Sequence, residues 1–236
     1  MSDTNINNNK KQKMMEYPQA PDSEWPEAWL MTESEVEDQC LPNKQTPNVP
    51  VDAAGMRQLG INYWKLDAAA YEYPIKAIPW DPADAADPKL QALRDDRGYN
   101  YADIITIHPD HLPEFDKKIA AFFEEHIHDA EEIRYILAGS GYFDVRDLND
   151  KWVRIHIKAG DLMTLPEGIY HRFTCDETRY IHAMRLFIVR MCRTTMLMCV
   201  CVCERISSPL TMMLYCHLLS ISLYTGTTGL DAVFSQ

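Results

Sequence analysis

The sequence predicts a mainly β protein, in which many short strands form a sandwich or barrel and a few helices lie at its periphery. Seven short strand-like runs lie between residues 126 and 187, and turns rich in Gly, Pro, Asn and Asp separate them. Apolar residues at helical spacing occur only before that region, in short stretches. The 236 residues suffice for one domain with a sizeable core, or for one domain with appendages.

The first half of the chain is expected to contain few regular elements. Residues 1–27 combine Asn and Lys runs with three prolines, so we expect a disordered lead-in. Along the rest, the patterns predict a weak helix at 51–59, a strand at 62–66, a proline-rich loop at 69–88, a short helix at 89–97, a strand or turn at 102–107 and a helix at 113–125.

The second half is predicted to hold most strands of the barrel. Their expected positions are 126–128, 132–138, 141–146, 152–157, 162–165, 171–174 and 181–187.

Two histidines and a carboxylate are clustered in the run Glu125-His-Ile-His-Asp-Ala-Glu-Glu-Ile-Arg134. Side chains alternate between faces in an extended chain, so His126, His128, Glu132 and Arg134 would share one side. The residues between His128 and Glu132 could turn or bulge, so this argument is strongest for the two histidines. Two His and one carboxylate with open positions are typical ligands of non-haem Fe(II) or a related divalent ion.

A second segment is expected to complete this site. It reads Gly160-Asp-Leu-Met-Thr-Leu-Pro166-Glu-Gly168-Ile-Tyr-His171. The two glycines permit backbone turns that other residues resist, and Pro166 fixes its own φ ahead of the second turn. His171 then begins a strand that could present its ring to the first three ligands.

Together the segments read His-x-His-x3-Glu-x6-Gly139 and, after twenty residues, Gly160-x5-Pro-x-Gly-x2-His171. This two-part pattern resembles the cupin superfamily of small β-barrels. The resemblance implies a single cupin-type β-barrel (jelly roll) with a few peripheral helices. One position departs from the pattern, because Ala120 stands where the first cupin motif usually has glycine.

Further runs narrow the resemblance to the acireductone dioxygenase family. These runs are Glu124-Glu-His-Ile-His, Glu132-Ile-Arg-Tyr-Ile-Leu, Gly139-Ser-Gly-Tyr-Phe-Asp-Val-Arg146, Gly168-Ile-Tyr-His-Arg-Phe173, Glu37-Asp-Gln and Ala183-Met-Arg-Leu-Phe187. The resemblance covers residues 28–187, which we expect to form the catalytic domain. It implies a methionine-salvage enzyme that cleaves 1,2-dihydroxy-3-keto-5-methylthiopentene with O2.

The resemblance also implies a metal centre. By position, His126, His128, Glu132 and His171 take the four ligand roles, for one Fe(2+) or Ni(2+) per chain. The family resemblance implies that the ion selects the products: 2-keto-4-methylthiobutyrate and formate with iron, and methylthiopropionate, formate and carbon monoxide with nickel. Both ions accept these ligands, so the sequence does not choose between them.

Four further residues are candidates for the substrate site. Arg134 cannot readily lose its charge, and we expect it to stabilise the substrate anion, as the resemblance also suggests. Arg185 is a second candidate for that role, or else a residue of a structural ion pair. Phe122 and Phe173 either line the pocket or belong to the ordinary core.

The other histidines are not expected to bind the metal. His108 and His111 fall on an expected loop and are interpreted as solvated. His156 alternates with two isoleucines, so we expect a satisfied or exposed side chain, with a role behind the ligands as the alternative.

Charge and cysteine usage limit the partners and the compartment. The net charge of −12 argues against a general nucleic-acid binder, which would show a basic face. The polar opening of the chain predicts no secretory signal, and an odd count of 7 cysteines fits free thiols in a reducing compartment. We expect a monomer in the cytoplasm, with the nucleus left open, whose partners are the acireductone and O2 and neither nucleic acid nor a membrane.

The resemblance stops abruptly after Phe187. Residues 188–236 are poor in charge and rich in cysteine, and we interpret them as an atypical tail that is not native to the fold, from a translated intron, a frameshift or an alternative 3′ exon. Its Cys199-x-Cys-x-Cys203 run lacks the partner pair of a zinc site. Its apolar stretch at 209–224 is shorter than the roughly 20 residues of a spanning helix.

This ending leaves two other functions open beside the dioxygenase. One is a catalytically impaired metal-binding cupin or interaction protein. The other is a cupin that catalyses a different reaction, such as isomerisation, with the same ligands.

Overall fold

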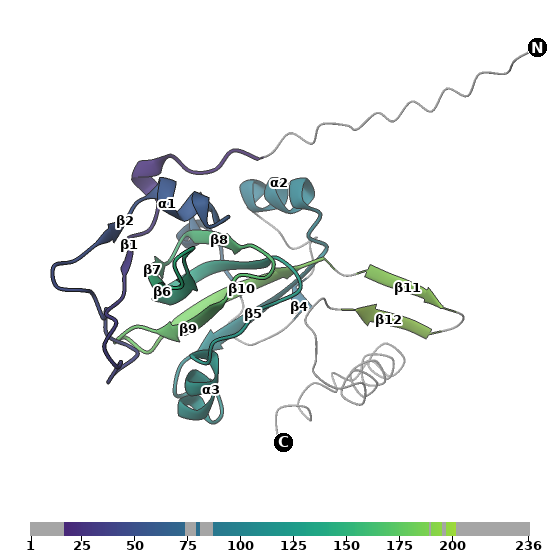
Figure 1. Cartoon of the computed structure of the whole chain (residues 1–236). Coiled ribbons are helices and arrows are strands. Elements are labelled where there is room, and N and C mark those ends of the chain that lie inside the picture. The colour runs from purple at the N-terminus through teal and green to yellow at the C-terminus, as the bar shows by residue number, and fades with distance from the viewer. Residues whose placement is uncertain (1–16, 74–78, 81–86, 189, 195–196, 202–236) are drawn as a thin grey trace, which may run out of the picture.

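The computed structural model describes residues 17–73, 79–80, 87–188, 190–194 and 197–201. Its main body is a strongly curled sheet, with a few short helices around it (Figure 1). The strands of this sheet are β1 (Ala28–Leu30), β2 (Pro50–Val51), β3 (Asn62–Lys65), β4 (Pro79–Trp80), β5 (Tyr101–Ile107), β6 (Glu132–Arg146), β7 (Trp152–Lys158), β8 (Asp161–Leu165), β9 (His171–Cys175) and β10 (Ile181–Phe187). The helices are α1 (Ala53–Gln58), α2 (Pro88–Arg97) and α3 (Phe115–Phe122), with 3-10 turns η1 (Asp22–Glu24) and η2 (Ala68–Ala70).

Strand β6 connects the two halves of the sheet. Its path runs in the order β2-β1-β7-β6-β10-β5-β4, with β8 and β9 also paired to β6 and β3 paired to β8. The first part of β6 pairs with β8 and β10, and its last part pairs with β7 and β9. Every one of these pairs is antiparallel. A single strand therefore carries Glu132 and Arg134 at one end and pairs with both halves of the curled sheet.

A glycine lets β6 pass from one half of the sheet to the other. Gly139 has φ +73° and a Cβ there would lie 2.1 Å from the carbonyl oxygen of Tyr180. Only glycine tolerates both the left-handed conformation and this close approach. The register of the neighbouring β10 shifts between His182 and Ala183, opposite this point. The sequence predicted two strands here, at 132–138 and 141–146, and the structure joins them into one.

Alternation along β10 separates two apolar cores. Ile181 and Ala183 belong to the core inside the curled sheet, whereas Met184 and Leu186 belong to a second core on its other side. The inner core also gathers side chains such as Ile107, Ile136, Phe143 and Ile155. The odd-numbered side chains of β10, including Arg185, thus face the interior of the barrel.

Helix α2 closes the second core and has clear end signals. The Asp87 side chain accepts from the backbone N–H groups of Lys89 (2.8 Å) and Leu90 (3.3 Å), and Pro88 opens the first turn. Gly98 ends the helix in a left-handed conformation, with φ +76°. Leu90 and Leu93 are fully buried, so the helix is fixed against the sheet by its apolar face.

The predicted elements agree with the structure at most positions. Helices α1, α2 and α3 and strands β3, β5, β7, β8, β9 and β10 are confirmed, with ends that differ by a few residues. The predicted strand at 126–128 is wrong as a strand, because only an isolated bridge pairs His126 with His171. Strands β1 and β2 were not predicted, since each is too short to show alternation.

The disordered lead-in predicted for residues 1–27 is wrong for its described part, residues 17–27. The backbone N–H of Ala20 donates to Tyr63 O at 3.0 Å, and the indole of Trp25 donates to Ala20 O at 3.1 Å. Trp25 is buried beside Tyr63, with ring centroids 5.5 Å apart. Trp25 therefore anchors a segment whose polar, proline-containing composition is typical of disordered chains.

Part of the predicted tail lies within the described residues. Strands β11 (Arg190–Thr194) and β12 (Leu197–Cys201) pair with each other as a separate two-stranded sheet. Residues 1–16, most of the predicted loop at 69–88, the Cys203 end of the cysteine run and the apolar stretch at 209–224 lie outside the described residues.

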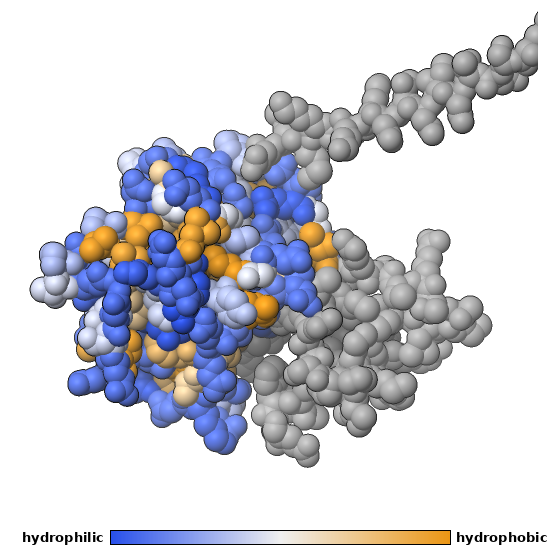
Figure 2. All heavy atoms as spheres, viewed as in Figure 1, coloured by the Kyte–Doolittle hydropathy of each residue, from blue (hydrophilic) through white to orange (hydrophobic). Residues whose placement is uncertain are grey.

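The visible face of the described body is mostly hydrophilic, with a few separate apolar patches (Figure 2). Across the described ranges, we find no helix long and apolar enough to cross a membrane.

Candidate metal centre

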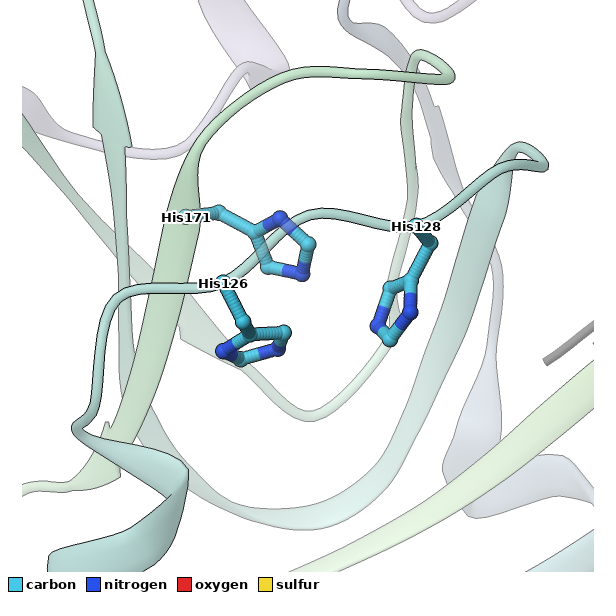
Figure 3. A group of neighbouring side chains, drawn as sticks. All are labelled: His126, His128 and His171. Atoms are coloured by element: carbon cyan, nitrogen blue, oxygen red, sulfur yellow. The ribbon is translucent and has the colours of Figure 1, made fainter. Parts of the chain in front are cut away.

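Three imidazoles from two distant segments converge at one end of the barrel. His126 and His128 lie just before β6, and His171 is the first residue of β9; their rings turn toward one another (Figure 3). One ring nitrogen from each lies within 4.8 Å of those of the other two. The backbones of His126 and His171 exchange two N–H to O hydrogen bonds of 3.0 Å each. This bridge brings the two sequence motifs together.

The Glu132 carboxylate adjoins the same cluster. Its Oε2 lies 3.0 Å from His128 Nε2 and 3.1 Å from His171 Nε2. Ligand atoms about 2.1 Å from a shared ion lie about 3 Å apart when they are at right angles to one another. These spacings fit the coordination of one ion by Glu132, His128 and His171. The donor set of nitrogen and carboxylate oxygen suits Fe(II), Ni(II) and similar divalent ions.

Backbone carbonyls fix the tautomers of two of the imidazoles. His126 Nδ1 lies 2.8 Å from Glu124 O, and His171 Nδ1 lies 2.9 Å from Ile169 O. A carbonyl oxygen only accepts, so Nδ1 carries the proton in both rings and Nε2 has a lone pair for a metal. Burial is the largest influence on His126 and lowers its pKa, which favours the neutral form that a metal requires.

Charge keeps the buried Glu132 ionised. Burial alone would raise its pKa, but the positive charge of Arg134 outweighs this effect and holds the pKa well below its usual range. Arg134 Nη2 lies 2.9 Å from Glu132 Oε1, and Arg134 Nη1 donates to Ile133 O at 3.0 Å. The carboxylate thus directs one oxygen to the imidazoles and the other to a guanidinium.

An apolar cavity of about 250 Å³ opens beside the cluster. It is lined by Ile105, Ile107, Phe122, His126, His128, Glu132, Arg134, Ile136, Phe143, His171, Phe173, Ile181, Ala183 and Arg185. All eight side chains named from the sequence as ligands or substrate-site residues therefore line one cavity. Phe122 and Phe173 meet edge to face, with ring centroids 6.5 Å apart.

Arg185 both lines the cavity and forms an ion pair. Its Nε and Nη2 donate to the two oxygens of Asp103 at 2.7 and 2.6 Å. In the sheet, Arg185 lies between Asp103 of β5 and Arg134 of β6 in register. The two alternatives left open by the sequence are thus compatible, because the ion pair fixes the guanidinium at the cavity wall.

A second, more polar cavity of about 340 Å³ reaches the cluster from another side. Its walls are Tyr99, His128, Asp129, Ala130, Glu131, Glu132, Arg134, Glu167, Leu186, Phe187 and Ile188. His128, Glu132 and Arg134 belong to both cavities and separate them.

Apart from Phe122 and Phe173, the apolar residues of the first cavity were not predicted from the sequence, and neither was Asp103. Ile181 and Ala183 could have been found, because they share the parity of Arg185 on one strand. Asp103 and Ile105 depend on the pairing of β5 with β10, which no local pattern reveals. Within the described ranges, the three histidines above are the sole such group of metal-ligand side chains. His156 instead packs against Tyr142, with tilted rings whose centroids lie 5.0 Å apart, and its Nε2 lies 3.4 Å from Asp176 Oδ2.

The comparisons with known proteins agree with this geometry. The profile of the ARD/ARD′ family matches residues 27–191. Over 162 residues, the chain is 52% identical to acireductone dioxygenase of Danio rerio, covering 69% of this chain and 82% of the relative. It is 54% identical over 162 residues to acireductone dioxygenase of Monodelphis domestica, covering 69% and 83%.

A solved structure resembles the fold. Acireductone dioxygenase from Bacillus anthracis, with a cadmium ion in its active centre, has a TM-score of 0.50 and 19% identity, covering 70% of this chain and 93% of that one. The likeness confirms the predicted fold class, a mainly β, cupin-type barrel.

Proposed function

This chain belongs to the ARD/ARD′ family and is an oxidoreductase, and from that premise we propose that it cleaves 1,2-dihydroxy-3-keto-5-methylthiopentene with O2. The observation that carries the proposal is the convergence of His126, His128, Glu132 and His171 at a cavity of about 250 Å³. The proposal includes one Fe(II) or Ni(II) per chain and a role in methionine salvage.

The four side chains would hold the ion as one carboxylate and three neutral imidazoles. This set leaves net positive charge on a divalent ion, which favours an anionic partner. When bound, the ion supplies Lewis-acid chemistry, lowering the pKa of an ene-diol and orienting it. The fixed Nδ1–H groups of His126 and His171 keep the rings in the orientation that this task requires.

The two arginines provide fixed positive charge at the cavity wall. The guanidinium of Arg134 can stabilise the enediolate form of the substrate. Arg185, held by Asp103, can contact the same anion from the neighbouring strand. Both are proposed as residues that touch the substrate.

The apolar walls suit the rest of this substrate. Phe122, Phe173 and the isoleucines of the cavity can bury a thioether-bearing chain and exclude water from the reacting end. Where water is excluded, an arginine charge attracts an anion more strongly than the same charge does in bulk water, because charges interact more strongly at low dielectric.

Anaerobic reconstitution tests the proposal. The purified chain is loaded with Fe(II) or Ni(II) without O2. The acireductone and O2 are then added, and O2 uptake and products are measured. We expect 2-keto-4-methylthiobutyrate and formate with iron, and methylthiopropionate, formate and carbon monoxide with nickel. Size-exclusion chromatography of the same samples tests the proposed monomer.

The second candidate is a metal-binding cupin without turnover. The observation that favours it is the end of the family match at residue 191, with 45 further residues that the match leaves out. Metal bound in stoichiometric amount without O2 uptake would support this candidate. An isomerised product formed without O2 would support a different cupin reaction.

A further inference from the structure

Three side chains next to the metal centre form a cluster that the reaction itself does not use. Arg97 is the last residue of α2, Tyr99 comes directly after the capping Gly98, and Glu131 lies in the loop just before Glu132. Arg97 Nε donates to Glu131 Oε1 at 3.3 Å and Arg97 Nη2 donates to Glu131 Oε2. The Tyr99 hydroxyl donates to Glu131 Oε1, and Arg97 Nε also lies 3.3 Å from that hydroxyl. Both carboxylate oxygens of Glu131 are thus engaged.

Glu131, the hydrogen-bond acceptor of this cluster, lies in the segment between two proposed ligands, His128 and Glu132. Residues 129–131 connect His128 to Glu132 without regular secondary structure. On one side, the backbone of His128 accepts from Gly168 N at 3.0 Å. On the other side, Glu132 begins β6, opposite Leu165 of β8. Glu131 adds a side-chain attachment within the connection itself, adjacent to Glu132.

The donor side of the cluster is part of the rigid core. The Arg97 guanidinium lies over the ring of Trp64 at 5.4 Å, and Trp64 is 2% exposed. Tyr99 is buried, and α2 is fixed by Leu90 and Leu93. A bidentate arginine–carboxylate pair restricts orientation as well as distance. The connecting segment is therefore tied to the second core rather than left to solvent.

We propose that Arg97, Tyr99 and Glu131 are positioning residues that slow the release of the metal from its site. The proposal rests on the metal centre proposed above. His128 and Glu132 must stay about 3 Å apart at their ligand atoms, and movement of the segment between them would separate them. Partners behind the ligands typically change metal affinity by about 10- to 100-fold.

The test measures metal release in the full chain. Glu131→Gln, Arg97→Lys and Tyr99→Phe are each loaded with Ni(II), and the ion is captured by excess chelator while its release is followed with time. We expect Glu131→Gln and Arg97→Lys to release nickel roughly 10-fold faster than wild type, with a smaller increase for Tyr99→Phe. The melting temperature of each metal-free variant is measured in parallel.

A matched control is available elsewhere in the chain. Arg57 forms an ion pair with Asp22 and lies over the ring of Trp25 at 4.5 Å, far from the ligand segment in sequence. Arg57→Lys makes the same chemical change in a more exposed ion pair beside a tryptophan, and it should leave nickel release unchanged. If Glu131→Gln or Arg97→Lys does not fold, the release rate of Tyr99→Phe tests the proposal, because this variant keeps the buried ring.

Two failures are distinguishable. If wild type does not retain nickel, the proposed metal centre is wrong. If wild type retains nickel and the folded cluster variants release it at the wild-type rate, the positioning role is wrong. Faster release that matches Arg57→Lys would also overturn it.

Discussion

Replacing His171 with alanine separates the metal centre from the fold. The imidazole is 2% exposed, lies 3.1 Å from Glu132 and donates to Ile169 O. The bridge that joins the two motifs is made by the backbones of His126 and His171, so alanine can keep it. We therefore expect His171→Ala to fold and to lose tight metal binding.

The expected loss of metal affinity can be estimated from the removal of one direct ligand. Partners behind the ligands are worth about 10- to 100-fold in affinity, so loss of a direct ligand should cost at least about 100-fold, or roughly 2.7 kcal/mol. Metal at about 100 times the wild-type Kd stabilises the wild type by roughly 2.7 kcal/mol, and the variant by only about 0.4 kcal/mol. For a chain of this size, these values correspond to melting shifts of roughly 5–11 °C and about 1–2 °C.

The assay is a thermal melt with and without Fe(II) or Ni(II) under anaerobic conditions, together with metal analysis after desalting. His156→Ala is the control, because His156 packs against Tyr142 and does not belong to the cluster of His126, His128 and His171. A metal-dependent shift in His171→Ala equal to that of wild type would remove His171 from the site. If His156→Ala also lost the metal-dependent melting shift, the effect would not be specific to the histidine cluster.

Three further predictions concern charge. Arg134→Ala should retain metal and lose about 100- to 1000-fold in kcat, measured by O2 uptake; full activity would contradict its assigned role. Asp144 is 1% exposed and accepts from Arg154 (2.7 and 2.8 Å) and Arg172 (2.9 Å), so Asp144→Asn should cost about 3–5 kcal/mol in urea unfolding, and a loss below about 1 kcal/mol would refute this estimate. Burial lowers the pKa of His182 from 6.5, so the unfolded chain protonates first and stability should fall as pH decreases below about 6.5; His182→Gln should weaken this dependence between pH 7.5 and 5.5.

Local spacing was enough to predict which side chains converge at the candidate metal centre, for a physical reason. His126 pairs with His171 by a backbone bridge, so the chain is locally extended there and His126 and His128 point to the same side. Glu132 reaches them although the segment before it is not a strand. Its position is set by β6, whose alternation also brings Arg134 to the cavity.

The remainder of the site depends on register, which a single sequence does not contain. Arg185 acquires Asp103 and Arg134 as neighbours only because β10 lies between β5 and β6 in one alignment. A shift of one residue would turn Arg185 toward the second core. The error over residues 17–27 has a different origin, because composition averages over a segment and hides one anchoring residue such as Trp25.

The end of β10 connects the tail to the chemistry without giving it a ligand. All four proposed ligands precede residue 188, yet Leu186, Phe187 and Ile188 line the cavity of about 340 Å³ that reaches His128 and Glu132. Ile188 therefore ends the described barrel at the wall of that cavity. A changed tail should act on access to the cluster and on product release, whereas metal content should follow the ligands alone. The dioxygenase and the impaired cupin thus differ in turnover at equal metal occupancy, which makes the ratio of O2 uptake to bound metal the quantity that separates them.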